Sequence, residues 1–371
     1  MPCLLFVVND IDFFLSHRLP LALGAMGEGF EVHLAAADGP SAAEVQRHGL
    51  AFHGLPMTRS GMHPLDEVRT LAELVRLYRR VRPDLVHHVT PKPILYGSLV
   101  ARLVGIRGIV NAPAGLGWVF NRRGLRADVL RLGFKQAYRF AFMTPRSRTV
   151  FQNPDDRAEL VDGGYVDREH TVLIKGSGVD LERFAPEPEP PAPVLVVLPA
   201  RMLLHKGIAE FVAAAATLRG SARFALVGAP DTGNRTAVPP ATLRGWQDAG
   251  TVEWWGHQSD MPRVYAQSHI VCLPSYREGL PKSLIEAAAC ARPIVATDVP
   301  GCREIVRHGH NGLLVPARES AELAAALGRL IADGAERRRL GANGRALAVA
   351  EFSVASVVAD TLAIYRTLLA S

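Results

Sequence analysis

Short apolar runs alternate along this chain with longer stretches in which apolar residues recur every three or four positions. In the first half, the strand-like runs lie at residues 4–8, 31–36 and 85–88, and the helical patterns at 19–26, 41–48, 65–81 and 94–104. Such a rhythm is typical of β/α units on a parallel sheet. The pattern therefore predicts an α/β fold.

The rhythm is interrupted by APEPEPPAP at 185–193, which can form neither a helix nor a central strand because proline fixes φ and lacks an N–H. Beyond it, strand-like runs lie at 194–198, 223–227, 251–255 and 270–273, and helical patterns at 208–218, 281–290 and 354–369. We therefore predict two Rossmann-like, doubly wound domains, over 1–184 and 194–350, joined by a linker over 185–193. The last segment, 351–371, is predicted to be a helix with no strand after it, so either domain could receive it.

Composition narrows the class of protein. A chain of 371 residues suits two domains, and its 48% hydrophobic and 21% charged residues favour neither disorder nor a membrane-spanning protein. The first apolar run has no basic flank and is closed by Asp10 and Asp12, so we interpret it as a strand and not a signal peptide. Four scattered cysteines without Cys-x-x-Cys spacing favour buried thiols in a reducing, cytoplasmic compartment.

A formal charge of +6 favours anionic partners such as phosphates, nucleic acid or an acidic membrane surface. No Gly-x-Gly-x-x-Gly follows a strand and no P-loop motif occurs, so dinucleotide-binding and P-loop functions lose their strongest support. Nucleic-acid binding is disfavoured because a recognised module and aromatic stacking motifs are absent.

The most informative segment is LPSYREGLPKSLIE at 273–286, which is predicted to run from strand through loop to helix. Gly279 lets the loop backbone approach a ligand, and Pro281 suits the first helical position. The free N–H groups of Leu280, Lys282 and Ser283 would then form a phosphate site.

Two carboxylates flank this predicted phosphate site. Glu278 precedes the helix and Glu286 lies inside it, up to about 12 Å further along the axis. A nucleotide sugar carries a hydroxyl-rich ring on each side of its diphosphate, so one carboxylate could hold each ring. The alternative interpretation is a solvated loop residue and an ordinary charge on a helix face.

A basic pair occurs in PARMLLHKG at 199–207, directly after the first strand of the second domain. Ligands of doubly wound sheets bind at such carboxyl ends. Arg201 offers a fork for phosphate oxygens and Lys206 a movable charge, which suits a leaving diphosphate. Two solvated loop cations are the alternative.

Together with GSGVDLERF at 176–184 and PGCRE at 300–304, these segments resemble the retaining glycosyltransferases of family 4, whose GT-B fold has two Rossmann-like domains facing a cleft. FFLSHRLP at 13–20, PKPILYG at 91–97, GLGWVF at 115–120 and FQNPD at 151–155 resemble a bacterial branch that includes N-acetylgalactosaminyltransferases acting on undecaprenyl-diphosphate sugars. The resemblance covers almost the whole chain.

The resemblance implies that Arg201 and Lys206 contact the donor diphosphate, Glu278 the hexose and Glu286 the ribose. It also implies backbone amides at 279–281, a final helix that crosses back to the first domain, and retention of anomeric configuration. The chain departs from the family at NDIDFFLSHR (9–18), where many relatives have a Gly-Gly loop, and at Ala291, where glycine is common.

Other residues give weaker signals for chemistry. Asp10 and Asp12 resemble a metal-binding Asp-x-Asp pair, but the diphosphate already has cationic partners, so we expect no metal and no cofactor besides the donor substrate. We expect acceptor or phosphate contacts from residues at strand ends of the first domain: Ser16, His17, Arg18, His87, His88 and Lys92. Gly115 and Gly117 either let a loop approach the donor sugar or form a turn.

Segment 122–148 contains eight basic residues and one acid, interleaved with Leu130, Phe134, Tyr138 and Phe142. It resembles a basic amphipathic helix that could dock on anionic lipid, peripherally on the inner face of the cell membrane. An ordinary solvated helix with one face in the core is the alternative.

The sequence thus predicts a metal-independent, retaining hexosyltransferase. It would move a sugar, which the resemblance suggests is an N-acetylhexosamine, from a UDP-sugar to a glycan or a polyprenyl-diphosphate-linked saccharide in cell-surface polysaccharide biosynthesis. A nucleotide-sugar 2-epimerase of the same fold is the alternative enzyme, and a non-catalytic nucleotide-sugar-binding protein is a third possibility.

Overall fold

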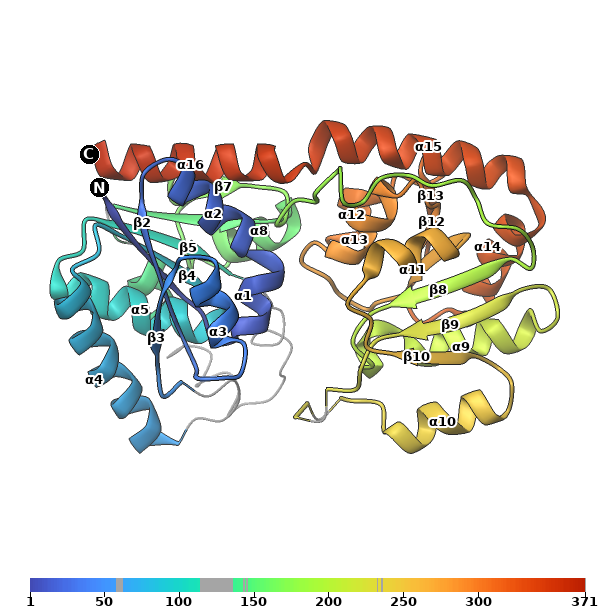
Figure 1. The fold of residues 1–371 in the computed structure, drawn as a ribbon, viewed down its shortest axis with the longest axis horizontal. Helices are drawn as coiled ribbons and strands as arrows, with labels where there is room; N and C mark the ends of the chain where they lie inside the picture. The colour runs from blue at the N-terminus through green and yellow to red at the C-terminus, as the bar shows by residue number, and fades with distance from the viewer. Residues whose placement is uncertain are drawn as a thin grey trace. The chain divides into compact units, whose positions relative to one another are not determined.

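The computed structural model describes residues 1–57, 63–113, 136–142, 144, 146–231, 233–234 and 236–370. The chain forms two compact units: unit 1 comprises Met1–Ser177 and Ala355–Ser371, and unit 2 comprises Gly178–Val354. The proline-rich segment 185–193 packs on unit 2, where the Arg337 side chain bonds to Glu189 and the Arg292 side chain to the Glu187 carbonyl. Each unit is an α/β structure around its own sheet (Figure 1).

Unit 1 is built on a seven-stranded sheet in the order β3-β2-β1-β4-β5-β6-β7. Its strands are β1 (Cys3–Val7), β2 (Glu31–Ala36), β3 (Ala51–Gly54), β4 (Leu85–Val89), β5 (Gly108–Ala112), β6 (Ser147–Phe151) and β7 (Thr171–Leu173). Every pair of neighbouring strands is parallel. The order from β3 to β6 is that of the Rossmann fold.

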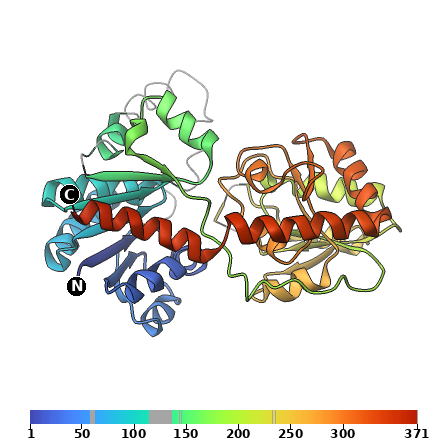
Figure 2. The same cartoon turned by 90° about the horizontal axis from the view of Figure 1, so that it is seen from above.

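The described helices of unit 1 lie on both faces of this sheet. They are α1 (Ile11–His17), α2 (Leu19–Gly27), α3 (Ala42–Arg47), α4 (Pro64–Val81), α5 (Pro91–Val104), α8 (Pro154–Asp162), the 3-10 turn η1 (Arg168–His170) and α16 (Val354–Ala370). Leu4 and Phe6 of β1 pack with α1, α2 and α16, whereas Leu5 and Val7 pack with α4 and α5. Figure 2 shows α16 lying along unit 1. Burial on both faces explains why β1 is apolar throughout.

Unit 2 has a six-stranded sheet in the order β10-β9-β8-β11-β12-β13, again parallel throughout. The strands are β8 (Leu195–Pro199), β9 (Arg223–Val227), β10 (Glu253–Gly256), β11 (Ile270–Leu273), β12 (Ile294–Thr297) and β13 (Gly312–Val315). The helices are η2 (Leu204–Lys206), α9 (Ile208–Thr217), α10 (Pro240–Asp248), α11 (Met261–Gln267), α12 (Lys282–Ala289), α13 (Cys302–Ile305), α14 (Ser320–Ala332) and α15 (Gly334–Glu351). The predicted pair of Rossmann-like parallel sheets is therefore confirmed.

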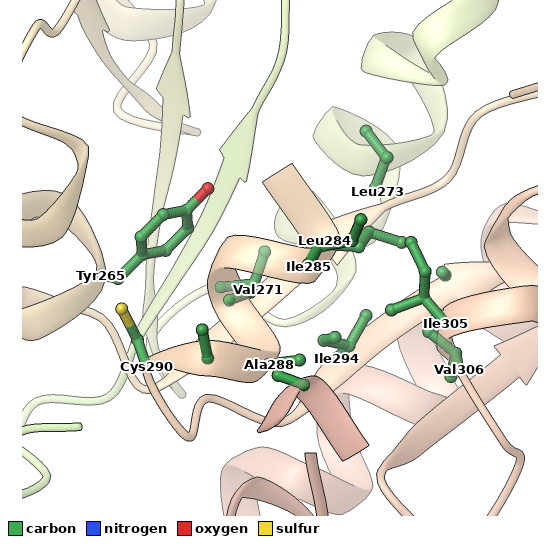
Figure 3. Close-up of a cluster of buried hydrophobic side chains, with 14 of the residues drawn as sticks. Tyr265, Val271, Leu273, Leu284, Ile285, Ala288, Cys290, Ile294, Ile305 and Val306 are labelled. Carbon is green, nitrogen blue, oxygen red and sulfur yellow. The ribbon is translucent and has the colours of Figure 1, made fainter. Parts of the chain in front are cut away.

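One of the two cores of unit 2 holds α12 firmly against the sheet. Figure 3 shows Leu284, Ile285 and Ala288 of α12 among side chains of β11, β12 and α13. The other core lies under α9, α10 and α14. Because α12 is buried along this length, its first residues and the loop before it have a fixed position.

The strand order reverses between β8 and β11, which are neighbours in the sheet although about 70 residues separate them. At such a switch point the loops after the two strands diverge and leave room for a ligand at their carboxyl ends. These are the loops that contain Lys206 and Glu278. No helix in the part of the chain that the structure describes is long and apolar enough to cross a membrane.

Candidate functional site

The loops after β8 and β11 are in direct backbone contact. Gly207 has φ +73°, and a Cβ there would lie 2.1 Å from the Pro274 carbonyl oxygen, so only glycine fits. The Tyr276 N–H donates to the His205 carbonyl at 2.9 Å. These contacts place the end of η2 beside the segment that carries Glu278.

Lys206 and Glu278 form an ion pair, with 2.5 Å between Nζ and Oε1. The side chains are only 17% and 9% exposed, so water screens their attraction little. Burial and the nearby Glu278 carboxylate raise the pKa of the Cys302 thiol well above its usual range, so this cysteine is a neutral thiol at neutral pH.

A glycine that the motif analysis did not single out supports the Glu278 loop. Gly301 has φ +81°, and a Cβ there would lie 2.4 Å from the Gly279 oxygen and 2.7 Å from the Glu278 oxygen. Both carbonyls are backbone atoms with little freedom to move. Gly301 therefore allows the chain before α13 to pack tightly against the loop. In the sequence, Gly301 is part of PGCRE (300–304), one of the segments that resemble the glycosyltransferase family.

Helix α12 begins at Lys282, with Pro281 as the capping residue at φ −71°, one residue later than the sequence predicts. Among the described residues, no side chain forms a capping hydrogen bond at the α12 N-terminus. The Leu280 side chain belongs to the core of unit 2 and is 8% exposed, so its possible contribution to a ligand is limited to its backbone. An N-terminus of this kind can bind phosphate.

Glu286 lies on the inner side of α12 and is 6% exposed. Its Oε2 accepts a hydrogen bond from the Tyr265 hydroxyl at 3.0 Å, and its Oε1 lies 3.4 Å from Lys282 Nζ. Burial raises the pKa of Glu286, against the opposing effects of Lys282, Tyr265 and Arg183. The alternative of a solvated helix-face charge is therefore wrong for Glu286, whose carboxylate is held in place by two neighbours.

Arg201 differs from Lys206 in its surroundings. Its side chain is 52% exposed, and Nη1 donates to Asp231 Oδ2 at 2.7 Å. Asp231 has no counterpart in the sequence prediction, because it lies in a loop without a motif. The structure thus brings Lys206, Glu278 and the start of α12 together, and leaves Arg201 at the surface beside them with a carboxylate partner.

The predicted acceptor residues of unit 1 fall in different environments. Ser16 Oγ donates to the Asp12 carbonyl at 2.7 Å, and His17 Nδ1 lies 2.7 Å from the same hydroxyl while its ring stacks on Phe13. Lys92 pairs with Glu67 at 2.7 Å, and both side chains are 16% exposed. Arg18 is buried, with 6% of its surface exposed.

His88 does not fit a role in acceptor contact. It is fully buried in unit 1, with Nε2 2.8 Å from the Tyr78 hydroxyl and Nδ1 2.9 Å from Asn111 Oδ1. Both ring nitrogens are therefore occupied by the protein itself. We correct this assignment: His88 is a hydrogen-bonded core residue.

Asp10 and Asp12 are engaged in local structure. Asp10 Oδ1 accepts from the Phe13 N–H at 3.0 Å and caps α1, and Asp12 Oδ1 accepts from the Ser41 hydroxyl at 2.6 Å. Within the described ranges, one group of three side chains is close enough to share a metal ion, namely Cys3, Glu31 and His33 at the amino ends of β1 and β2. It lies at the opposite end of the sheet from the carboxyl-terminal loops.

Gly115, Gly117 and most of the basic segment lie outside the described residues. At the end of that segment, Tyr138 and Phe142 are buried in a small cluster with Phe151 and Leu160. One side of residues 136–142 therefore faces the core, as the ordinary amphipathic interpretation expects.

The chain resembles known proteins in both halves. Residues 4–153 match the family model "Glycosyl transferase 4-like", and residues 193–333 match "Glycosyl transferases group 1". A Campylobacter jejuni relative described as an N,N'-diacetylbacillosaminyl-diphospho-undecaprenol α-1,3-N-acetylgalactosaminyltransferase is 25% identical over 89% of this chain and 92% of its own length.

Solved structures share the fold over the whole chain. Sucrose-phosphate synthase from Thermosynechococcus elongatus superimposes with a TM-score of 0.85 at 20% identity, covering 100% of both chains. HepE from Anabaena, in complex with UDP-glucose, gives a TM-score of 0.79 at 20% identity over 98% of this chain and 100% of its own. With the two parallel sheets, these likenesses confirm the GT-B fold class. The chain belongs to the glycosyltransferases that combine a glycosyl transferase 4-like first half with a group 1 second half.

Proposed function

We propose that this protein is a retaining glycosyltransferase that moves an N-acetylhexosamine from a UDP-sugar to a polyprenyl-diphosphate-linked saccharide in cell-surface polysaccharide biosynthesis. The observation that carries the proposal is the convergence of the Lys206–Glu278 pair with the uncapped N-terminus of α12. The acceptor class and the sugar are suggested by the described activity of the Campylobacter jejuni relative, and a UDP-sugar donor by the HepE complex.

In this proposal the donor diphosphate lies over the start of α12. The backbone N–H groups of Leu280, Lys282 and Ser283 and the Lys206 ammonium stabilise the negative charge that grows on the diphosphate as the sugar leaves. Arg201 reaches the same anion from its exposed position if it gives up Asp231. Stabilising this charge in the transition state more than in the ground state is what accelerates the transfer.

The two glutamates would contact the rings at either end of the diphosphate. Glu286, fixed by Tyr265 and Lys282, accepts hydrogen bonds from the ribose hydroxyls. Glu278 accepts from hexose hydroxyls once the donor takes its place at Lys206. Every one of these side chains lies in unit 2.

For retention we propose front-face displacement, in which the acceptor oxygen bonds to the anomeric carbon on the face that the diphosphate leaves. The acceptor hydroxyl proton passes to a donor phosphate oxygen, and the carbon–oxygen bond to UDP breaks. An NMR assignment of the anomeric configuration tests this step, and an inverted product contradicts it.

The function is tested by measuring UDP release from a panel of UDP-sugars, with and without lipid-linked acceptors and with excess chelator. We expect acceptor-dependent release that survives chelation and is lost in Glu278→Ala and Lys206→Ala. Acceptor-independent isomerisation of the donor would instead support the 2-epimerase. Loss of all activity in chelator would contradict metal independence.

We also propose that the basic segment 122–148 brings the protein to an anionic membrane surface, where a lipid-linked acceptor resides. Flotation with vesicles containing anionic lipid tests this at low and high salt. We expect co-flotation at low salt only, since screening weakens such binding. Protein that stays at the bottom of the gradient at low salt contradicts it.

A further inference from the structure

A small cavity lies within unit 1, between the carboxyl ends of its central strands and the helix α16. Its polar lining includes Arg18, His87, Gln152, Ser177 and Thr361, and its apolar lining includes side chains of α16. The cavity volume is about 20 Å³, which exceeds the roughly 10–15 Å³ that one water-sized molecule needs. The space therefore admits a small polar guest.

Arg18 brings a positive charge to this cavity. The residue is 6% exposed, and none of the described carboxylates forms an ion pair with it. Its Nη1 donates to the His17 carbonyl at 3.3 Å, while Nε is buried without a hydrogen-bond partner. Burial lowers the pKa of Arg18 to about 10, which leaves the guanidinium charged at neutral pH. A buried, unpaired cation is costly, so the cavity favours an anion.

His87 offers a second donor beside Arg18. Its Nδ1 lies 2.5 Å from the Tyr365 hydroxyl of α16, and its Nε2 is buried without a partner. Burial and the nearby Arg18 charge lower the pKa of His87 well below its usual range, so the ring is neutral. When the Tyr365 hydroxyl donates to Nδ1, the ring proton is on Nε2. This tautomer leaves an unused N–H in addition to that of Arg18.

We propose that this cavity binds a phosphate-class oxyanion, neutralised by the Arg18 guanidinium and hydrogen-bonded by the Nε2–H of His87. Two buried donors without partners, one of them charged, are the observation that carries the proposal. The anion could be free inorganic phosphate or the phosphate of a polyprenyl-linked acceptor. Only the second source rests on the function proposed above.

Binding can be measured without any sugar transfer. With UDP present at saturation to occupy the donor site, inorganic phosphate is titrated against the protein at constant ionic strength while the melting temperature is followed. We expect phosphate to raise the Tm of the wild type, since a ligand of the native state stabilises it. Arg18→Gln should weaken the apparent phosphate affinity by about tenfold or more, and His87→Phe by about fivefold.

Arg366→Gln is the matched control, because Arg366 also lies in unit 1 but its side chain is 58% exposed and paired with Glu28. It should respond to phosphate as the wild type does. Equal phosphate responses in wild type and Arg18→Gln would overturn the proposal.

A second measurement does not depend on how well Arg18→Gln folds. Exchange broadening of the ³¹P signal of inorganic phosphate is recorded with wild-type protein saturated with UDP. We expect broadening, and its absence would overturn the proposal.

Farnesyl phosphate, with farnesol as its control, then identifies the source of the anion. Displacement of inorganic phosphate by farnesyl phosphate and not by farnesol supports the acceptor headgroup. Binding of inorganic phosphate alone supports a free anion. Neither result depends on UDP-sugar turnover, so failure here and failure of the transferase assay are separate findings.

Discussion

Lys206 donates a hydrogen bond to Glu278, with 2.5 Å between Nζ and Oε1, across loops that follow two neighbouring strands. In the proposed reaction Lys206 binds the donor diphosphate and Glu278 binds the sugar. A donor must therefore compete with an internal carboxylate for the lysine. The pair keeps each side chain in place before the donor arrives.

This competition predicts opposite effects of two substitutions on UDP binding. Lys206→Ala removes a charge-assisted contact and should weaken UDP binding about tenfold or more. Glu278→Ala frees the lysine, so UDP affinity should stay the same or become a few-fold tighter, while the rate of transfer falls by about 100-fold.

Calorimetry with UDP and the turnover assay check these two readouts separately. Arg223→Ala is a suitable control, because Arg223 forms an exposed ion pair with Glu253 at the amino end of β9. UDP binding weakened equally by Glu278→Ala and Lys206→Ala would contradict the competition.

Gly301→Ala should be much more destabilising than Gly309→Ala. The two glycines have φ of +81° and +74°, but a Cβ at 301 meets backbone oxygens whereas one at 309 meets no atom within 4 Å. Gly309→Ala should cost about 1 kcal/mol of unfolding free energy from backbone strain alone. Gly301→Ala adds a backbone clash and should cost about 3 kcal/mol or more.

Urea unfolding measures the difference between the two variants. Displacement of the Glu278 loop in Gly301→Ala should also lower the turnover of the fraction that remains folded. Similar stability losses at 301 and 309 would show that the loop is not tightly packed there.

Glu286 predicts a pH dependence of donor binding. Since burial raises the pKa of Glu286 above its unfolded value, the carboxyl takes up a proton at a higher pH than an exposed glutamate. Its neutral form favours folding, so this contribution to stability is present below the unfolded pKa of about 4.5 and is lost as pH rises through the folded value.

Protonation also removes an acceptor for the ribose hydroxyls. UDP affinity of the wild type should therefore fall as pH decreases toward the unfolded pKa, and Glu286→Gln should lack that part of the profile. Calorimetric titrations with UDP between pH 5 and 8 compare the affinities of the wild type and Glu286→Gln. Inorganic diphosphate has no ribose, so its affinity should not show the pH dependence that Glu286→Gln removes from UDP binding.

His88 predicts acid lability of unit 1. Burial lowers the pKa of His88 to about 4, so the folded protein resists the proton that the unfolded chain accepts near pH 6.5. The stability is full above the unfolded pKa and is lost as pH falls toward the folded one, by about 3 kcal/mol in all.

His88→Asn should be less stable than the wild type at pH 7 and should lose less stability on acidification. His63→Asn, at an exposed position, is the control and should keep the wild-type profile. Denaturant unfolding from pH 7 to pH 4 checks the slopes. Parallel slopes for His88→Asn and wild type would contradict the assignment.

Much of the fold is predictable because most of its strands are buried on both faces. The runs at 223–227 and 270–273 match β9 and β11 residue for residue, since continuous apolar runs bounded by turns are distinctive. Helix α1 was missed because it is short and its Asp10 cap resembled part of a metal motif. The strand order itself depends on contacts between distant residues and has no local signature.

The sequence predicts which residues form the site better than it predicts the contacts between them. Glu278 and Glu286 lie in one continuous segment of loop and helix, so the sequence indicates their spacing directly. The Lys206–Glu278 pair joins residues 72 positions apart, and Gly301 supports the loop from a third segment. His88 was misassigned because a strand-end histidine looks the same in sequence whether its nitrogens face a ligand or a buried tyrosine.

Because α16 packs in unit 1, the two units become complete in sequence at different times during synthesis. Tyr365 and Leu368 belong to the same core as Leu4 and Phe6, so that core lacks a helix until the residues that follow unit 2 have been translated. Unit 2, spanning Gly178–Val354, is complete in sequence earlier. During synthesis the later unit can therefore finish folding first, while the earlier one waits with an uncovered apolar face.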